Sequence, residues 1–158
     1  MKKIILLCTL AVVMFACKST SATSTNTDRK AQVNMKGNWE ISSVTYPGSQ
    51  YVKVNSFQLA DSECFVGSKW KFVSNNNKGS MAIAKPGCLS FSSPITWFVN
   101  NDKQFVLKVL SAGEKAKKVR DGYVLRLDNQ NDTSFQLVDK IDVAGKMTDV
   151  VYQFNKVN

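Results

Sequence analysis

The sequence predicts an all-β domain, either a sandwich or a barrel, in a chain of 158 residues that has room for one domain. From residue 36 onward, apolar side chains recur at every second position, which is the period of a strand with one buried face. Turn residues interrupt these runs about every 10–12 residues, a spacing typical of antiparallel sandwiches and barrels. No segment has the periodicity of a convincing amphipathic helix, and no internal repeat or second domain is visible.

The expected strands follow one another along the chain, each with one apolar face. The run from Lys69 to Val73 alternates charged with aromatic residues, and later runs alternate in the same way. The side chains that share a face are Trp70 and Phe72; Ile95, Trp97 and Val99; Phe105, Leu107 and Val109; Tyr123, Leu125 and Leu127; Phe135 and Leu137; and Val150, Tyr152 and Phe154. Turn residues lie between the runs, at 47–48, 75–79, 86–87, 100–102, 112–113, 128–132 and 144–145.

The first 16 residues predict export. Lys2 and Lys3 precede an apolar run over residues 4–15, which is shorter than the roughly 20 residues of a transmembrane helix and matches a secretory signal peptide. Ala16 and Cys17 then resemble a bacterial lipobox. The resemblance implies cleavage before Cys17 and acylation of this cysteine, which would anchor the chain to a membrane. The alternative is an ordinary signal peptide cleaved elsewhere, for example after Ala22.

The segment after Cys17 predicts a flexible tether. Between Lys18 and Gln32 the chain is rich in Thr, Ser and Ala and has no aromatic or large aliphatic residue, so it cannot bury enough surface to fold. The expected organisation is a lipoprotein signal peptide at 1–16, a lipidated tether at 17–35 and the folded domain at 36–158. Lys18 stands where an aspartate resembles the inner-membrane retention signal of enterobacterial lipoproteins, which favours the outer membrane.

Export also limits the roles of the four cysteines. Cys8 leaves with the signal peptide and Cys17 takes the lipid, so Cys64 and Cys88 remain in an oxidising compartment, where one pairing is available to them. A disulfide between them would close a loop of about 25 residues and contribute about 3–4 kcal/mol in the chain-entropy model. A zinc site is the alternative, but two thiolates without histidine are too few for tetrahedral ligation. We therefore expect no metal and no cofactor.

The composition argues against several classes of function. The chain has no histidine, which excludes Ser-His-Asp and Cys-His catalysis. Its formal net charge is +9, but an exported chain without a long stripe of basic and aromatic residues is a poor match for nucleic acid. Asp139, Asp142 and Asp149, and Asp121 and Asp128 around one strand, are candidate acid–base carboxylates, with turn capping as the alternative. We therefore expect that the protein is not an enzyme.

Two groups of residues resemble a known family. Residues 37–39, Gly-Asn-Trp, resemble the G-x-W motif of the lipocalin first strand. The order of Cys64, the Trp-Lys-Phe run at 70–72, Cys88 and Trp97 resembles the bacterial lipocalin-like domain of small Bacteroidetes-type lipoproteins.

The resemblance covers about residues 36–157 and implies an antiparallel up-and-down β-barrel of about eight strands. Trp39 would then pack across the closed end of the barrel. Lipocalins usually carry an arginine near the last strand that stacks on this tryptophan, whereas the last strand here has only Lys156.

A barrel of eight strands either holds one small ligand or is filled by its own side chains. The candidate ligand-binding residues are the inward aromatics Trp70, Phe72, Trp97, Phe105, Tyr123, Phe135 and Tyr152, with core packing as the alternative role. A second candidate is the basic cluster Lys115, Lys117, Lys118 and Arg120. It would attract anionic ligands or lipid head groups at an open barrel mouth, and would otherwise be a solvated loop.

These observations lead to one functional hypothesis and one alternative. The hypothesis is a monomeric outer-membrane lipoprotein of the cell envelope, periplasmic or surface-exposed, whose barrel binds a small apolar or amphipathic ligand without catalysis. The alternative is a filled barrel that acts as a structural or interaction protein at the envelope. The interior distinguishes them, because a ligand site needs a cavity of about 300 Å³ or more.

Overall fold

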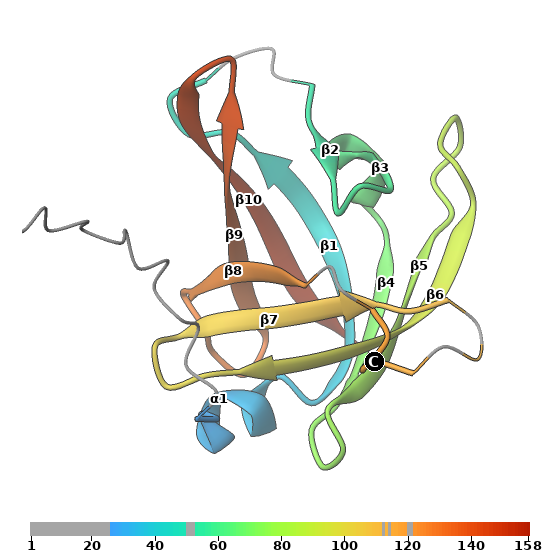
Figure 1. The fold of residues 1–158 in the computed structure, drawn as a ribbon, viewed down its shortest axis with the longest axis vertical. Helices are drawn as coiled ribbons and strands as arrows, with labels where there is room; N and C mark the ends of the chain where they lie inside the picture. The colour runs from blue at the N-terminus through green and yellow to red at the C-terminus, as the bar shows by residue number, and fades with distance from the viewer. Residues whose placement is uncertain (1–25, 50–52, 112, 114, 120–121) are drawn as a thin grey trace, which may run out of the picture.

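A closed antiparallel barrel of eight strands forms in the residues that the computed structural model describes, 26–49, 53–111, 113, 115–119 and 122–158 (Figure 1). Consecutive strands pair from β4 to β10, and β1 lies between β4 and β10, so the sheet closes on itself. The predicted all-β up-and-down barrel is therefore confirmed. The strands are β1 (Gly37–Thr45), β4 (Lys69–Val73), β5 (Lys78–Ile83), β6 (Phe91–Val99), β7 (Gln104–Val109), β8 (Tyr123–Asp128), β9 (Ser134–Val143) and β10 (Lys146–Val157).

The faces of the strands follow the alternation seen in the sequence. In β6, Ile95, Trp97 and Val99 are buried, whereas Ser92 and Pro94, which point to the opposite face of the strand, are exposed. Successive side chains of a strand point to opposite faces, so the buried set of every strand fills the barrel. The expected shared faces of β6, β7, β8 and β10 are confirmed.

A short helix, α1 (Arg29–Asn34), closes one end of the barrel (Figure 1). Met35 and Ala31 are 0% and 2% exposed, and the Asp28 carboxylate accepts the N–H of Ala31 as the helix N-cap. The Gln32 side chain is also buried and accepts the N–H of Val99 on β6 at 3.3 Å.

The prediction of a flexible tether up to residue 35 is therefore wrong for its last residues. The fold already includes Asn26, whose carbonyl accepts the N–H of Asn101 at 2.9 Å. The prediction rested on the lack of large apolar residues in this segment. The segment folds because the Asp28 cap and the buried Gln32 amide satisfy polar groups of the backbone. The expected signal peptide, Cys17 and the rest of the expected tether lie outside the described residues.

A small hairpin and a 3-10 turn lie between β1 and β4, at the end of the barrel opposite α1 (Figure 1). The hairpin consists of β2 (Asn55–Ser56) and β3 (Ala60–Asp61), and the turn is η1 (Ser62–Phe65). We call this end of the barrel the mouth.

The predicted disulfide is present. Cys64 in η1 bonds to Cys88 in the turn between β5 and β6, with an S–S distance of 2.03 Å and a Cα–Cα distance of 5.7 Å. It ties the segment after the hairpin to the rim of the barrel. Among the described residues, no helix is long and apolar enough to span a membrane.

Candidate functional site

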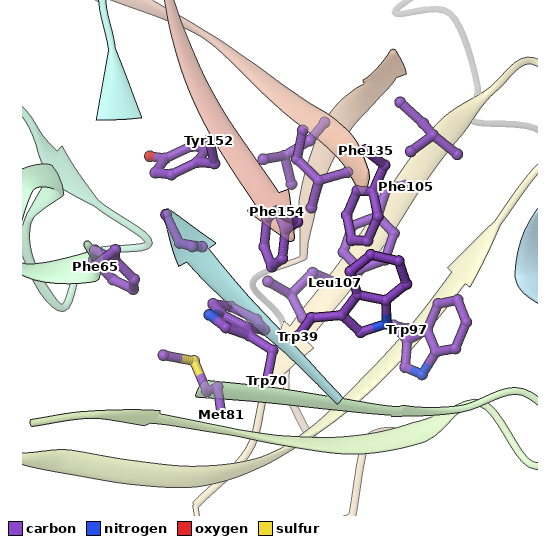
Figure 2. Close-up of a cluster of buried hydrophobic side chains, with 14 of the residues drawn as sticks. Trp39, Phe65, Trp70, Met81, Trp97, Phe105, Leu107, Phe135, Tyr152 and Phe154 are labelled. Carbon is purple, nitrogen blue, oxygen red and sulfur yellow. The ribbon is translucent and has the colours of Figure 1, made fainter. Parts of the chain in front are cut away.

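Six of the seven aromatic residues predicted to bind a ligand lie in the packed interior. Each is at most 3% exposed, and all but Tyr152 are joined by ring contacts within the cluster of buried side chains (Figure 2). Phe72, for example, lies 4.9 Å from Trp97 and 5.7 Å from Phe105 between ring centroids. These six residues are Trp70, Phe72, Trp97, Phe105, Phe135 and Tyr152. The structure gives them a packing role, and a ligand contact by any of them stays a prediction.

The seventh residue, Tyr123, lines a pocket of about 500 Å³ at the barrel mouth. One wall of the pocket is the hairpin tip and the opposite wall is the mouth ends of β6, β7 and β8. The whole lining is Phe57, Gln58, Leu59, Phe91, Ser92, Ser93, Val109, Leu110, Ser111, Val119 and Tyr123. This volume falls within the range of about 300–1,000 Å³ that small-molecule sites occupy.

The alternation of the strands places both apolar and polar groups in this pocket. Phe91 on β6 and Val109 on β7 belong to the inward faces of their strands and lie nearer the mouth than the packed aromatics Trp97 and Phe105 on the same strands. The hydroxyl-bearing residues Ser93, Ser111 and Tyr123 lie in the same wall. Such a lining suits an amphipathic molecule, because its apolar part gains burial while its polar part meets hydrogen-bonding groups.

Three tyrosine hydroxyls hold the hairpin and η1 against the barrel. The Tyr123 hydroxyl donates to the Phe57 carbonyl at 2.6 Å, and the hydroxyl of Tyr152 on β10 bonds to that of Ser56 at 2.5 Å. The Tyr46 hydroxyl bonds to the hydroxyl of Ser62. Burial raises the pKa of both Tyr46 and Tyr152, so these hydroxyls keep their protons at neutral pH and can donate.

The hairpin tip is the part of the site that the sequence did not reveal. Phe57, Gln58 and Leu59 carry none of the glycine, proline or asparagine that signals a turn. Phe91 begins β6, ahead of the predicted run of Ile95, Trp97 and Val99. The available signal was the disulfide, because a bond from Cys64 to Cys88 requires the segment before β4 to reach the turn before β6.

The candidate carboxylates do not form an acid–base pair. Asp149 is paired with Arg126 and Lys140 on the outer surface, at 3.5 and 3.3 Å. Asp142 accepts the N–H of Gly145 in the β9–β10 turn at 2.7 Å, and Asp128 is bound by Arg126. These are capping and surface roles. Asp121 lies outside the described residues.

Asp139 differs from the other carboxylates because it faces the barrel interior. It is opposite the buried Val150 on β10, and paired residues of an antiparallel ladder point to the same face. Burial raises the pKa of Asp139 above its ordinary value. The described part of the chain contains no group of three or more side chains able to hold a metal ion.

The predicted basic cluster borders the mouth pocket. Lys115, Lys117 and Lys118 are exposed, and the next residue, Val119, lines the pocket. The ammonium of Lys108 donates to the carbonyl of Val119 at 2.9 Å, which fixes this loop to β7. Arg120 lies outside the described residues.

The fold and the mouth pocket define a lipocalin-like barrel: eight antiparallel strands in up-and-down order, closed by a helix at one end and hollowed at the other. Three solved structures are similar in fold. A lipocalin-like protein from Bacteroides uniformis is 12% identical, covers 78% of this chain and 99% of its own, and has a TM-score of 0.48. A bovine odorant-binding protein in complex with a selenium-containing odorant is 11% identical, covers 87% of this chain and 78% of its own, and has a TM-score of 0.44.

A deswapped triple mutant of bovine odorant-binding protein is similar as well. It is 12% identical, covers 78% of this chain and 74% of its own, and has a TM-score of 0.41. No family model matches the sequence, and no curated protein matches it.

Proposed function

We propose that the protein binds a small amphipathic molecule at the barrel mouth and performs no catalysis on it. The pocket of about 500 Å³ carries this proposal, because the barrel below it is filled by aromatic side chains. With the hairpin closed as it is here, the ligand enters only the outer layer of the barrel, with its apolar part against Phe91 and Val109 and its polar part toward the exposed Ser92 and Ser111. The exposed lysines at 115, 117 and 118 favour a ligand with a negative end.

Native mass spectrometry of residues 26–158, expressed in a bacterial periplasm and purified gently, tests this proposal. We expect a discrete mass adduct that is lost on denaturation and is displaced by the fluorescent probe N-phenylnaphthylamine. Phe91→Ala removes a pocket wall and should weaken probe binding about tenfold, the equivalent of about 1.4 kcal/mol. Val124→Ala, on the exposed outer face of β8, is the matched control and should leave binding unchanged.

A filled barrel that contacts other envelope molecules is the second candidate function. The packing of the interior favours this candidate, because six buried aromatic side chains fill the barrel between the mouth and α1. A bare domain in native mass spectrometry, together with no binding of N-phenylnaphthylamine, would support this candidate and would exclude the mouth pocket as a ligand site.

We also propose that acylated Cys17 anchors the barrel to the outer membrane. The supporting observations are the apolar run at residues 4–15, the Ala16-Cys17 pair and the lysine at position 18. Cells fed radiolabelled palmitate should label the wild-type protein, and Cys17→Ser should abolish both the label and membrane association. A Cys17→Ser protein that still sediments with outer membranes would disprove the anchor.

A further inference from the structure

The tip of the β2–β3 hairpin adopts a backbone conformation that its residues disfavour. Phe57 and Gln58 have φ angles of 52° and 53°, and the N–H of Leu59 bonds to the carbonyl of Ser56 across them. A turn with two left-handed central residues usually has Asn-Gly at these positions, because a bulky side chain there is strained. Such strain persists only where the surroundings hold the residue in place.

An aromatic box holds Phe57 in place. The Phe57 ring is 5% exposed, and four rings from different elements surround it. The distances between ring centroids are 5.2 Å to Phe65, 5.2 Å to Tyr123, 5.5 Å to Tyr152 and 6.3 Å to Trp70. The chain therefore inserts its own aromatic ring into a site with the geometry that aromatic rings favour.

The box and the mouth pocket are continuous. Phe57 belongs to the lining of the pocket and also to the interior of the box, and Tyr123 is shared in the same way. If the Phe57 ring left the box, the pocket would extend inward by the volume of that ring. The new space would be bounded by Phe65, Trp70 and Tyr152 as well.

The attachments of the hairpin allow its tip to move while its base stays. The disulfide fixes Cys64, and the tip itself is held by the hydrogen bonds from Tyr123 to Phe57 and between Tyr152 and Ser56. Both tyrosines lie at the mouth end of the interior, where water or a polar ligand group can replace the hairpin as their partner.

We propose that Phe57 is a displaceable plug, and that the protein binds amphipathic molecules carrying an aromatic ring that takes the place of the Phe57 ring among Phe65, Trp70, Tyr123 and Tyr152. This inference rests on the proposed function of the mouth pocket and names the chemical class of its ligand. The polar part of the ligand lies toward the serines of the pocket. The plug competes with the ligand within one molecule, so the apparent affinity is reduced by the fraction of molecules whose box is open.

Competition titrations of the full chain with N-phenylnaphthylamine, displaced by phenylbutyrate or by decanoate, test the plug. Phe57→Ala removes the competitor. Because a minor open state is commonly populated at 10% or less, we expect phenylbutyrate to bind at least about tenfold more tightly to this variant, and decanoate to gain much less. Gln58→Gly relieves the strained turn and stabilises the closed hairpin, so it should weaken phenylbutyrate binding severalfold while raising the melting temperature.

Leu59→Ala is the matched control, because Leu59 lines the pocket from the same hairpin but lies outside the box. It should not favour phenylbutyrate over decanoate. If Phe57→Ala fails to fold, the proposal is tested by Gln58→Gly alone, which should weaken phenylbutyrate binding. Equal gains for both acids in Phe57→Ala, or no loss in Gln58→Gly, overturn the plug while leaving the mouth pocket intact. Absence of any probe binding in every variant overturns the pocket and the plug together.

Discussion

The indole of Trp39 contacts residues from the start and from the end of the folded domain. Its N–H donates to the carbonyl of Met35 at 2.8 Å, and the ammonium of Lys156 on β10 lies 5.6 Å from the ring centroid. Lys156 thus has the position that the lipocalin resemblance assigns to an arginine. A lysine serves there because a cation over an indole face is attracted by the ring electrons whichever basic residue carries it.

Lys156→Met should lower the free energy of unfolding by about 0.5–1 kcal/mol, the usual worth of an exposed cation–π contact. Lys156→Arg should preserve or increase stability, because a guanidinium also stacks on an indole. Urea denaturation measures both changes, with Lys115→Met in the exposed mouth loop as the control. A Lys156→Met protein as stable as the control would show that the contact contributes nothing.

Asp139 makes stability depend on pH in the direction opposite to a salt-bridged carboxylate. Burial raises its pKa in the folded state, so the folded chain binds a proton at pH values where the unfolded chain does not. Its contribution to stability therefore improves as the pH falls from the folded pKa toward the unfolded one. Asp28 has the opposite sign: the Ala31 N–H and Lys103 lower its pKa, so its contribution is lost as the pH falls.

Asp139→Asn should therefore raise the melting temperature at pH 7 and lose this advantage as the pH is lowered toward about 4, near the pKa of an unperturbed aspartate. The hydroxyl of Tyr152, whose pKa is raised by burial and also by the charge of Asp139, stays protonated over this range. Thermal unfolding between pH 4 and 8 is the measurement, and exposed Asp132→Asn is the control. A variant less stable than wild type at pH 7 would contradict the sign.

At the scale of the secondary-structure elements, the strands could be predicted and the caps of the barrel could not. Runs such as Ile95, Trp97 and Val99 repeat a period that only a strand places on one face. The helix α1 has six residues, and β2 and β3 have two each, which is too short for any period to show. These short elements form because the finished barrel offers Val99, Tyr123 and Tyr152 as hydrogen-bond partners.

The contribution of α1 can be measured with one pair of substitutions. Met35, at the end of the helix, is 0% exposed, whereas Val33 is 57% exposed. Met35→Ala should cost about 2–5 kcal/mol of unfolding free energy, the usual cost of removing a buried methionine side chain. Val33→Ala is the matched control and should change stability by no more than about 0.5 kcal/mol. Equal, small changes in the unfolding free energy of the two variants, measured by urea denaturation, would show that this segment behaves as a flexible tether.

At the scale of the whole molecule, the barrel divides along its axis into a packed half and a mouth. The sequence predicted which aromatics face inward, but not how deep each one lies, because depth depends on the register between strands. Tyr123 is the first residue of β8, at the mouth, whereas Phe135 is the second residue of β9, near α1, so two residues with the same pattern have different surroundings. The plug residue Phe57 was hidden because its turn has no sequence signal.

This division predicts that stability and binding respond to different layers of one strand. Leu107 and Val109 are successive inward residues of β7; Leu107 is 0% exposed and Val109 lines the pocket. Leu107→Ala should cost about 2–5 kcal/mol of unfolding free energy. It should change the affinity for N-phenylnaphthylamine by no more than about twofold, because the Leu107 side chain is not part of the pocket lining.

Val109→Ala should cost less stability, since the side chain is only half-buried, and should weaken the probe severalfold because the pocket loses part of its apolar wall. Urea denaturation and fluorescence titration on the same samples give both quantities. If Leu107→Ala weakened binding as much as Val109→Ala, the ligand would reach below the mouth layer. The packed aromatics outside the Phe57 box, such as Trp97 and Phe105, would then contact the ligand as first predicted.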